Sequence, residues 1–136
     1  ILLVPEQFTL QAERELLSRL ALPGFFTIQV LSPSRLQSRV LADGIVQAAR
    51  DVGYPISSTR VGSMFCTFFT SHQVTDWASA ATCDTKAFAR YFLAMLDKGI
   101  YLAPSQFETA FMSAAHSEQE IEATIAAARS CFGLIA

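Results

Sequence analysis

Residues 99–124 constrain the fold most, because a strand signal, a proline turn, a second strand signal and a helix start follow one another there. Residues 100–103 form a short apolar run that predicts a strand, and Pro104 ends it because proline has no backbone N–H to donate. Ser117 and Glu120 have the spacing of a capping box, which marks the first turn of a helix. The segment therefore predicts a strand, a turn, a second strand and a helix, which the rest of the chain supports.

One acid, Glu108, lies in the predicted turn. It is flanked by three apolar residues, Phe107, Phe111 and Met112. A carboxylate in an apolar neighbourhood stays ionised only when a cation or several hydrogen-bond donors face it. We therefore expect Glu108 to be partly buried, and either to form a salt bridge, with Arg60 or Arg90 as its partner, or to face a ligand.

The composition is that of one globular domain with no electrostatic preference for polyanions. Of 136 residues, 51% are hydrophobic, which is enough for a core, and the formal net charge is −2. Binding to nucleic acid or to an anionic membrane requires a basic excess that this chain lacks. No apolar run approaches the roughly 20 residues of a membrane span, and the start lacks the charged region of a signal peptide. We expect a soluble, cytoplasmic protein with neither a membrane nor a nucleic acid as its partner.

The cysteines and histidines do not form a metal-binding or disulfide pattern. Cys66, Cys83 and Cys131 are an odd number at wide spacings, and the two histidines are His72 and His116. A zinc site needs closely spaced pairs of such ligands, which are missing here. We expect no metal ligands and three reduced thiols.

The first part of the chain predicts a strand, a helix, a strand and a second helix. The strands are residues 1–4 and 25–31, and the first helix is residues 7–20. The second helix begins at Pro33 and ends before Gly53, because proline suits the first turn of a helix and glycine the position after its end.

Gly44 is the one poor fit in this second helix, because glycine in a helix interior costs about 1 kcal/mol relative to alanine. The predicted apolar stripe of the helix comprises Leu36, Val40, Leu41, Ile45, Ala48 and Val52. A stripe of this kind predicts that one face of the helix is buried.

The later part of the chain predicts a small sheet beside helices. Residues 54–59 are expected to form a loop, and residues 60–70 a single buried strand in which Gly62 marks a bulge or a close backbone approach. Asp84 is placed to cap a helix that ends before Gly99. The expected fold class is α/β (α+β), a small sheet flanked by helices.

Three segments of the chain resemble one enzyme family. They are RVGSMFCTFFT at residues 60–70, DWASAATCDTKAFARYF at residues 76–92 and GIYLAPSQFETAFMSAAHSEQEIEATIAAAR at residues 99–129. All three closely resemble the C-terminal small domain of glutamate-1-semialdehyde 2,1-aminomutase, an isomerase of the class III aminotransferase group that uses pyridoxal 5'-phosphate. The resemblance implies that residues 42–136 form the C-terminal small domain of a fold-type I enzyme.

The resemblance also implies an activity for the parent enzyme. That enzyme moves an amino group within its small-molecule substrate, glutamate 1-semialdehyde, to give 5-aminolevulinate for tetrapyrrole (porphyrin) biosynthesis, and it is a homodimer. In the family the cofactor lysine lies in the large domain, and neither Lys86 nor Lys98 lies in a motif like that of the cofactor lysine. A chain of 136 residues is too short for a complete aminotransferase. We therefore expect a fragment that is inactive alone and has no catalytic or cofactor-binding residue.

One site residue is implied by position. The segment SQFETAF resembles the family segment whose glutamate faces the amino groups of the substrate, so the resemblance implies that Glu108 binds substrate. A carboxylate suits that role because the substrate presents ammonium groups. His116 resembles the corner before the last helix of the family, where we expect a hydrogen-bonded structural histidine.

The start of the chain resembles a different family. The segments ILLVPEQFTLQAERELLSRL and FFTIQVLSPSRL, within residues 1–37, resemble the N-terminal region of the B subunit of AddAB-type ATP-dependent helicase-nucleases. The chain has no GxxxxGK[ST] loop to hold phosphates and no iron–sulfur cysteine pattern. We expect residues 1–41 to be a strand–helix–strand segment of different origin from residues 42–136. The alternative functions are a fragment of a DNA-processing helicase-nuclease B subunit and a non-catalytic interaction domain.

Overall fold

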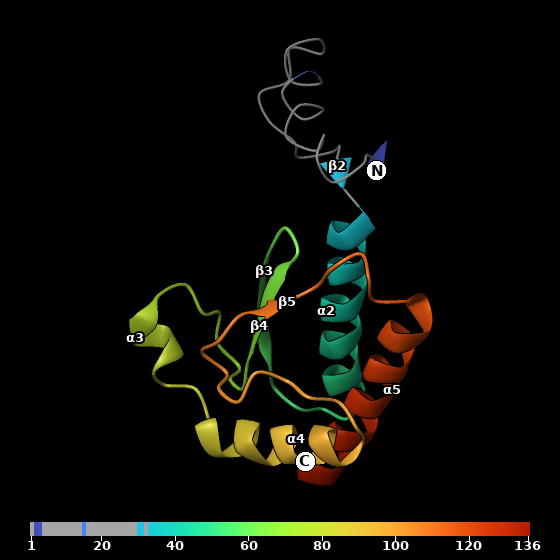
Figure 1. Ribbon diagram of the computed structural model, residues 1–136. Helices are drawn as coiled ribbons and strands as arrows, with labels where there is room; N and C mark the ends of the chain where they lie inside the picture. The colour runs from blue at the N-terminus through green and yellow to red at the C-terminus, as the bar shows by residue number, and fades with distance from the viewer. Residues whose placement is uncertain (1, 4–14, 16–29, 32) are drawn as a thin grey trace.

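The structure is a computed structural model, and it describes residues 2–3, 15, 30–31 and 33–136. The helix expected over residues 7–20 and most of the two strands expected near it lie outside the described residues. Two short described strands, β1 (Leu2–Leu3) and β2 (Val30–Leu31), pair in parallel. They lie beyond the N-terminal end of the first long helix (Figure 1).

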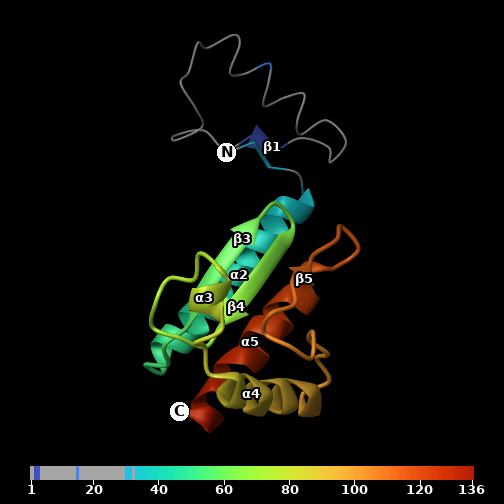
Figure 2. The same cartoon turned by 90° about the vertical axis from the view of Figure 1, so that its left-hand side faces the viewer.

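A long helix stands at the centre of the described chain. This helix, α2 (Pro33–Asp51), lies between a small sheet on one side and α5 (Glu118–Ile135) on the other (Figure 1). A third helix, α4 (Thr85–Asp97), crosses the C-terminal end of α5 (Figure 2), and a short helix, α3 (Trp77–Ala80), lies out beyond the sheet (Figure 1). The helices α2, α4 and α5 were all expected from the sequence. No helix among the described residues is long and apolar enough to cross a membrane.

The sheet has three antiparallel strands in the order β3 (Ser57–Val61), β4 (Met64–Phe68) and β5 (Ala110–Phe111). The prediction of one strand over residues 60–70 and of a loop over residues 54–59 is therefore wrong. Gly62 lies in the tight turn of a hairpin with a φ of 61°, a value that glycine adopts without strain. The expected fold class, a small sheet with helices beside it, is confirmed.

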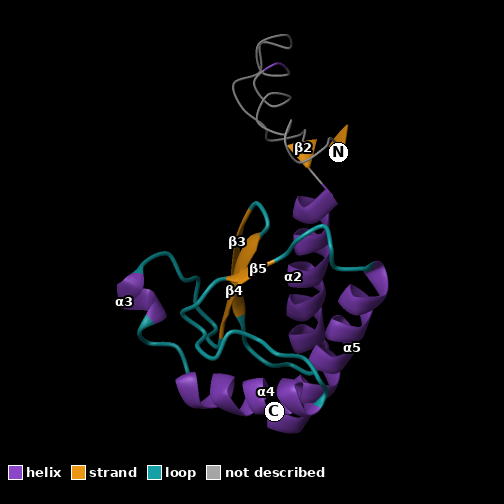
Figure 3. Cartoon of the chain, viewed as in Figure 1, coloured by secondary structure: helices purple, strands orange, loops and turns teal. Residues whose placement is uncertain are grey.

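The strand predicted over residues 100–103 is also absent. These residues are not in a strand, although Ile100 and Leu102 pack against the core. Ile100 N–H donates to the carbonyl of Met95 at 3.0 Å, so the segment begins as the C-terminal turn of α4. Its apolar side chains pack against the core, whereas its backbone does not pair with the strands β4 and β5. Figure 3 shows the whole connection from α4 to β5 as a loop.

The core lies where α2, α4, α5 and the sheet meet. Phe132 of α5 is fully buried, and its ring stacks on that of Tyr91 of α4 with centroids 4.5 Å apart. The ring of Phe69, just after β4, lies 5.4 Å from Tyr91 and 5.9 Å from Phe132. These three rings join the sheet to two helices, and aromatic pairs of this geometry stabilise a fold beyond their area of contact.

Gly44 has a packing role that the sequence does not reveal. A Cβ at this position would lie 2.4 Å from Cδ1 and 2.7 Å from Cγ1 of Ile125 in α5. Glycine thus allows α2 and α5 to approach closely, which offsets its unfavourable helix propensity. The predicted stripe of α2 is right at Leu41, Ile45 and Ala48, but wrong at Val40, which is 49% exposed.

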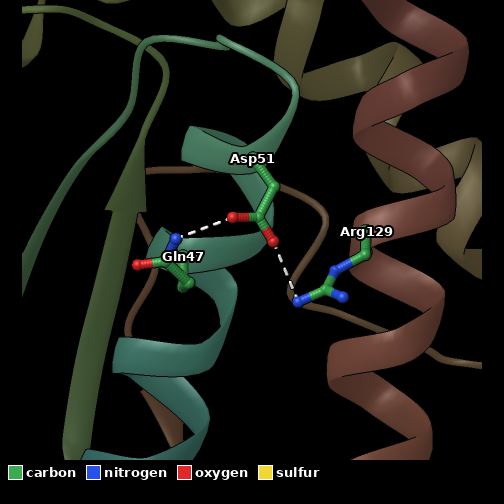
Figure 4. Close-up of polar contacts among 3 residues, drawn as sticks. All are labelled: Gln47, Asp51 and Arg129. Atoms are coloured by element: carbon green, nitrogen blue, oxygen red, sulfur yellow. Dashed lines mark hydrogen bonds and ion pairs between the residues drawn. The ribbon is translucent and has the colours of Figure 1, made fainter.

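A polar contact joins the C-terminal end of α2 to α5. Arg129 Nη2 lies 2.9 Å from Asp51 Oδ2, and Gln47 Nε2 donates to Asp51 Oδ1 at 2.7 Å (Figure 4). Both charged side chains are partly exposed, so the pair contributes little to the stability of the fold.

The helix ends follow the sequence signals. The side chain of Asp84 accepts a hydrogen bond from Ala87 N at 2.9 Å, and Gly99 beyond the end of α4 has a φ of 81°. Ser117 and Glu120 form the expected reciprocal capping box, with Glu120 N donating to Ser117 Oγ and Ser117 N donating to Glu120 Oε2. Local hydrogen bonding decides these boundaries, which is why they can be predicted.

Candidate functional site

The acid singled out by the sequence lies in the loop before β5. Glu108 N donates to the carbonyl of Ser105 at 3.1 Å, and Phe107 N donates to Ser105 Oγ at 3.2 Å. These bonds close a turn that presents Glu108 just before the strand that pairs with β4. The sequence prediction of a turn after Pro104 is therefore right.

The expectation that Glu108 is partly buried is wrong, because its side chain is exposed. Two of the three apolar neighbours do not cover it: Phe111 is 67% exposed and Phe107 is also exposed, while Met112 is buried in the core. Phe107 packs instead on the exposed ring of Trp77, with centroids 5.2 Å apart. An apolar residue next to Glu108 in sequence thus points elsewhere in space.

The structure bears on the two alternatives for this acid. Within residues 33–136, Glu108 forms no ion pair with Arg60, Arg90 or any other described residue. The salt-bridge alternative is therefore not realised among the described residues. An exposed carboxylate without a cationic partner is available to a ligand.

Glu108 borders a shallow pocket beneath its turn. The pocket has a volume of about 50 Å³. Its apolar lining residues include Ile45, Phe65, Phe88 and Leu102, and its polar ones include Cys66, Ser105, Gln106 and Glu108. This volume admits a few water molecules but no substrate-sized ligand. A substrate-sized ligand of Glu108 would therefore lie outside this pocket.

Contacts from β4 hold the turn in place. Cys66 Sγ lies 3.4 Å from Thr109 Oγ1 and 3.7 Å from the carbonyl oxygen of Glu108. Gln106 Oε1 accepts a hydrogen bond from Phe69 N at 3.1 Å, and Gln106 is only 3% exposed. Sequence reasoning missed Gln106, because a polar residue in a turn is normally exposed and its partner lies 37 positions away.

A second hollow, of about 300 Å³, shares Phe65, Leu102, Ala103 and Ala110 with the first. His116 and Glu120 border it. His116 Nδ1 lies 3.2 Å from Ser113 N, and its carbonyl accepts from Gln37 Nε2 at 2.9 Å, which agrees with a structural histidine. Two hydrogen bonds from Ser117 lower the pKa of Glu120; the bond from its backbone has the larger effect and the bond from its side chain the smaller one.

The remaining chemical groups are not assembled into a site. Lys86 and Lys98 are exposed at the two ends of α4, and neither borders the pocket of Glu108 or the hollow beside His116. Burial raises the pKa of the Cys83 and Cys131 thiols, so they are poor nucleophiles. His72 is exposed. No cluster of three or more His, Cys, Asp or Glu in the described part of the chain could hold a metal.

The described residues do not fit a pyridoxal-phosphate site. Such a site needs a lysine in a pocket, a carboxylate facing the ring nitrogen and donors for a phosphate. The lysines of α4 are solvated, and Glu108 is the acid of the first pocket. If the cofactor takes part in the chemistry of this chain, residues elsewhere hold it.

The fold is that of a known enzyme class. A crystal structure of an omega-transaminase from Sphaerobacter thermophilus matches 72% of this chain with a TM-score of 0.58 and 21% identity, over 22% of the transaminase chain. The described residues thus have the fold of a transaminase segment.

Comparison with relatives in sequence indicates a narrower enzyme family than the fold does. Residues of this chain are 59% identical to a glutamate-1-semialdehyde 2,1-aminomutase from Citrifermentans bemidjiense, over 87% of this chain and 26% of the relative. An enzyme of the same name from Geotalea daltonii is 57% identical over 71% of this chain and 22% of its own length. Another from Pelotomaculum thermopropionicum is 47% identical over 80% of this chain and 26% of its own length. The chain is thus similar to glutamate-1-semialdehyde 2,1-aminomutases, as its segments indicated, and spans about a quarter of their length.

A family model for the N-terminal region of AddB, described as "ADDB, N-terminal", matches residues 1–52. The second resemblance is therefore also supported. The 118 residues aligned with the Citrifermentans relative and this match must overlap, because together they exceed the length of the chain.

Proposed function

We propose that residues 42–136 act as the C-terminal small domain of a glutamate-1-semialdehyde 2,1-aminomutase, and that Glu108 faces the amino groups of the substrate. The observation that carries this proposal is an exposed carboxylate, without a cationic partner in the described region, at the end of a turn tied to β4. The names of the relatives support the reaction: an amino group changes position within one molecule.

The electrostatics suit an ammonium ligand. The Coulomb energy of an ion pair near a protein surface is several times larger than in bulk water, and an adjacent apolar wall increases it further. Phe107 packs on Trp77, so an apolar wall over Glu108 would have to come from another part of the proposed enzyme. The role of Glu108 is then to bind and orient an ammonium group, which a neutral side chain would do less well.

The cofactor of the proposed enzyme, pyridoxal 5'-phosphate, would be held by residues outside this chain. Its bound form supplies the acceptor for the amino group that is transferred. The described residues contribute substrate binding and the cover over it. The proposal includes a homodimeric, cytoplasmic parent enzyme of tetrapyrrole synthesis, with this chain inactive alone.

An apolar area near Glu108 supports contact with a further protein surface. Val61, Met64 and Phe111 are exposed, and the strand register places them side by side, since Met64 pairs with both Val61 and Phe111. Adjacent exposed apolar residues mark interaction surfaces more often than scattered ones do. The large domain of the proposed enzyme is the expected partner.

The proposal is tested by transplanting the domain. Residues 42–136 replace the corresponding segment of the Citrifermentans bemidjiense enzyme, and 5-aminolevulinate formation is measured with glutamate 1-semialdehyde. We expect an active hybrid in which Glu108→Gln lowers kcat/KM by about 10–100-fold, the loss of one charge-assisted hydrogen bond of roughly 1.5–3 kcal/mol.

Glu122 of α5 supplies the matched control, because it is an exposed glutamate away from the turn. Glu122→Gln should leave kcat/KM unchanged. A hybrid that folds and binds pyridoxal phosphate but forms no product would refute the domain assignment. Equal activity of the Glu108→Gln and unmodified hybrids would refute the role of Glu108.

A second candidate function follows from the family model over residues 1–52. We propose that residues 1–41 have a different origin from the rest and derive from a helicase-nuclease B subunit. The described α2 crosses this boundary without interruption, since it runs from Pro33 to Asp51. Salt-dependent binding of the full chain to duplex or single-stranded DNA would favour a DNA-processing function; absence of binding at low salt would exclude it.

A further inference from the structure

A broad polar hollow lies between α2 and β3, the strand at one edge of the sheet. It has a volume of about 570 Å³, and none of the residues that line it lines the pocket of Glu108. Cationic and uncharged polar residues make up much of its lining; they include Arg50, Arg60, Ser71, His72 and Gln73. Small-molecule pockets are normally mostly apolar, so a lining of this kind suits a charged ligand.

The periods of a helix and a strand explain why both arginines reach this hollow. Asp43, Val46 and Arg50 line it from α2 at the spacing i, i+3, i+7, which places them on one stripe of the helix. Arg60 pairs with Phe65 between β3 and β4, so these two side chains lie on the same face of the sheet. Phe65 belongs to the core that the sheet shares with α2. Arg60 therefore projects from the face of the sheet that is turned toward α2.

The hollow has a surplus of positive charge, although the formal net charge of the whole chain is −2. Within residues 33–136, neither Arg50 nor Arg60 forms an ion pair. Asp43 is the one acid among the described lining residues, and its Oδ2 already lies 3.5 Å from Nε of Arg39. The guanidinium group stays protonated at any physiological pH. An anion that enters the hollow would thus meet positive charge that no described carboxylate neutralises.

The arrangement of the donors suits a phosphate group. Arg50 comes from α2, Arg60 from β3 and Ser71 from the segment after β4, so the hollow is bordered from three directions. A phosphate ester has three terminal oxygens that point in different directions, whereas a carboxylate has two in one plane. Guanidinium groups bind such oxygens in pairs. A polymer of phosphates would extend beyond the hollow onto a chain of net negative charge, which disfavours it.

We propose that this hollow binds the phosphate group of a small molecule, with Arg50 and Arg60 as its two cationic partners. The volume admits the phosphate and part of the molecule that carries it. Neither Lys86 nor Lys98 borders the hollow, so it differs from a pyridoxal-phosphate site, which needs a lysine. The proposal does not depend on the proposed function, because its tests use the full chain and no aminomutase substrate.

Calorimetric titration of the full chain with pyrophosphate tests the site. At an ionic strength kept constant with sodium chloride, we expect saturable binding. Arg50→Gln and Arg60→Gln should each weaken it about 5–10-fold, because each removes one charged partner at a partly solvated site. Arg90→Gln is the matched control, because Arg90 is an exposed arginine of α4 that does not border the hollow; it should leave binding unchanged. No saturable binding by the unmodified chain, or equal weakening by all three substitutions, would overturn the proposal.

Nuclear magnetic resonance locates the bound anion. In the ¹⁵N-labelled full chain, pyrophosphate should shift the backbone amide signals of Arg60, Ser71 and Gln73 and leave those of α4 in place. The spectrum of Arg60→Gln should otherwise match that of the unmodified chain, which shows that the variant is folded. Shifts confined to other parts of the chain would assign the anion to another site and refute this one.

Two further anions separate a small phosphate from other sources of negative charge. Succinate offers two carboxylates, and a short single-stranded oligonucleotide offers phosphates in a polymer. Pyrophosphate should bind at least about tenfold more tightly than either at the same ionic strength. Equal or tighter binding of succinate would overturn the choice of phosphate. Tighter binding of the oligonucleotide that Arg50→Gln and Arg60→Gln weaken would assign the hollow to nucleic acid and overturn the proposal.

Discussion

The contact between α2 and α5 and the three-stranded sheet differ in how completely their side chains are covered. Between the two helices, Ala48 and Ala128 have no exposed surface, and Ile125 comes so close to Gly44 that a methyl group there would overlap it. On the sheet, Val61 is 70% exposed and Phe111 is 67% exposed. The covered side determines stability, whereas the open side carries Glu108 and the surface that another protein region can contact.

The largest effect should come from the covered side. Phe132→Ala removes a fully buried ring that contacts Tyr91, Phe69 and Tyr54. We expect this substitution to lower the free energy of unfolding by about 3–5 kcal/mol. Urea unfolding of the full chain measures this difference. Phe111→Ser, on the open side, should change stability by less than about 0.5 kcal/mol. Similar losses for both variants would remove the distinction between the two sides.

The next effect concerns the close approach of α2 and α5. Gly44→Ala should destabilise by about 1–3 kcal/mol, because its methyl group would overlap Ile125. Gly133→Ala is the matched control in α5, where a Cβ meets nothing within 4 Å; it should stabilise by about 0.5–1 kcal/mol through helix propensity. Denaturant midpoints give both values. Stabilisation by Gly44→Ala would show that the two helices are not in close contact.

A smaller effect is expected at the polar contact of the same two helices. Asp51→Asn removes the ion pair with Arg129, and it should lower stability by about 0.2–1 kcal/mol at low salt and by less at high salt. Denaturant unfolding at two salt concentrations distinguishes this from a packing defect. A loss that does not depend on salt would contradict an electrostatic origin.

The smallest effect concerns pH at the start of α5. Hydrogen bonds from Ser117 lower the pKa of Glu120 from its ordinary value of 4.5, so the ionised form is favoured in the folded state. This contribution is present above the unfolded value and is lost as the pH falls through the lower folded value. Hydrogen exchange at Ile121 N, which donates to Ser117 O, should therefore quicken relative to other α5 amides below about pH 4.5. Glu120→Gln should abolish that pH dependence, and its persistence in this variant would assign it to another group.

The sequence predicted those features that depend on neighbouring residues. The caps at Asp84 and Ser117 are local hydrogen bonds, and the helix ends follow from them. The hairpin was missed because an apolar run over residues 60–70 is compatible with one strand or two, and only the partner strand decides. The run at residues 100–103 was mistaken for a strand because apolar composition does not show whether the backbone or only the side chains will be paired.

The site was predicted in part. Pro104 and the residues after it predict the turn and its acid, but they do not predict the exposure of Glu108, because Phe107 and Phe111 suggest an apolar neighbourhood although neither covers it. Gln106 was missed because its hydrogen bond with Phe69 joins residues 37 positions apart in the chain. The role of Glu108 in substrate binding remains a prediction.

The contact of Gly44 with Ile125 means that these two positions cannot evolve independently. A lineage that acquires alanine at position 44 must first, or at the same time, shorten the side chain at position 125, or its helices must separate. We therefore expect volume to be exchanged between the two positions among relatives. The double variant Gly44→Ala with Ile125→Val should recover part of the stability that Gly44→Ala alone loses.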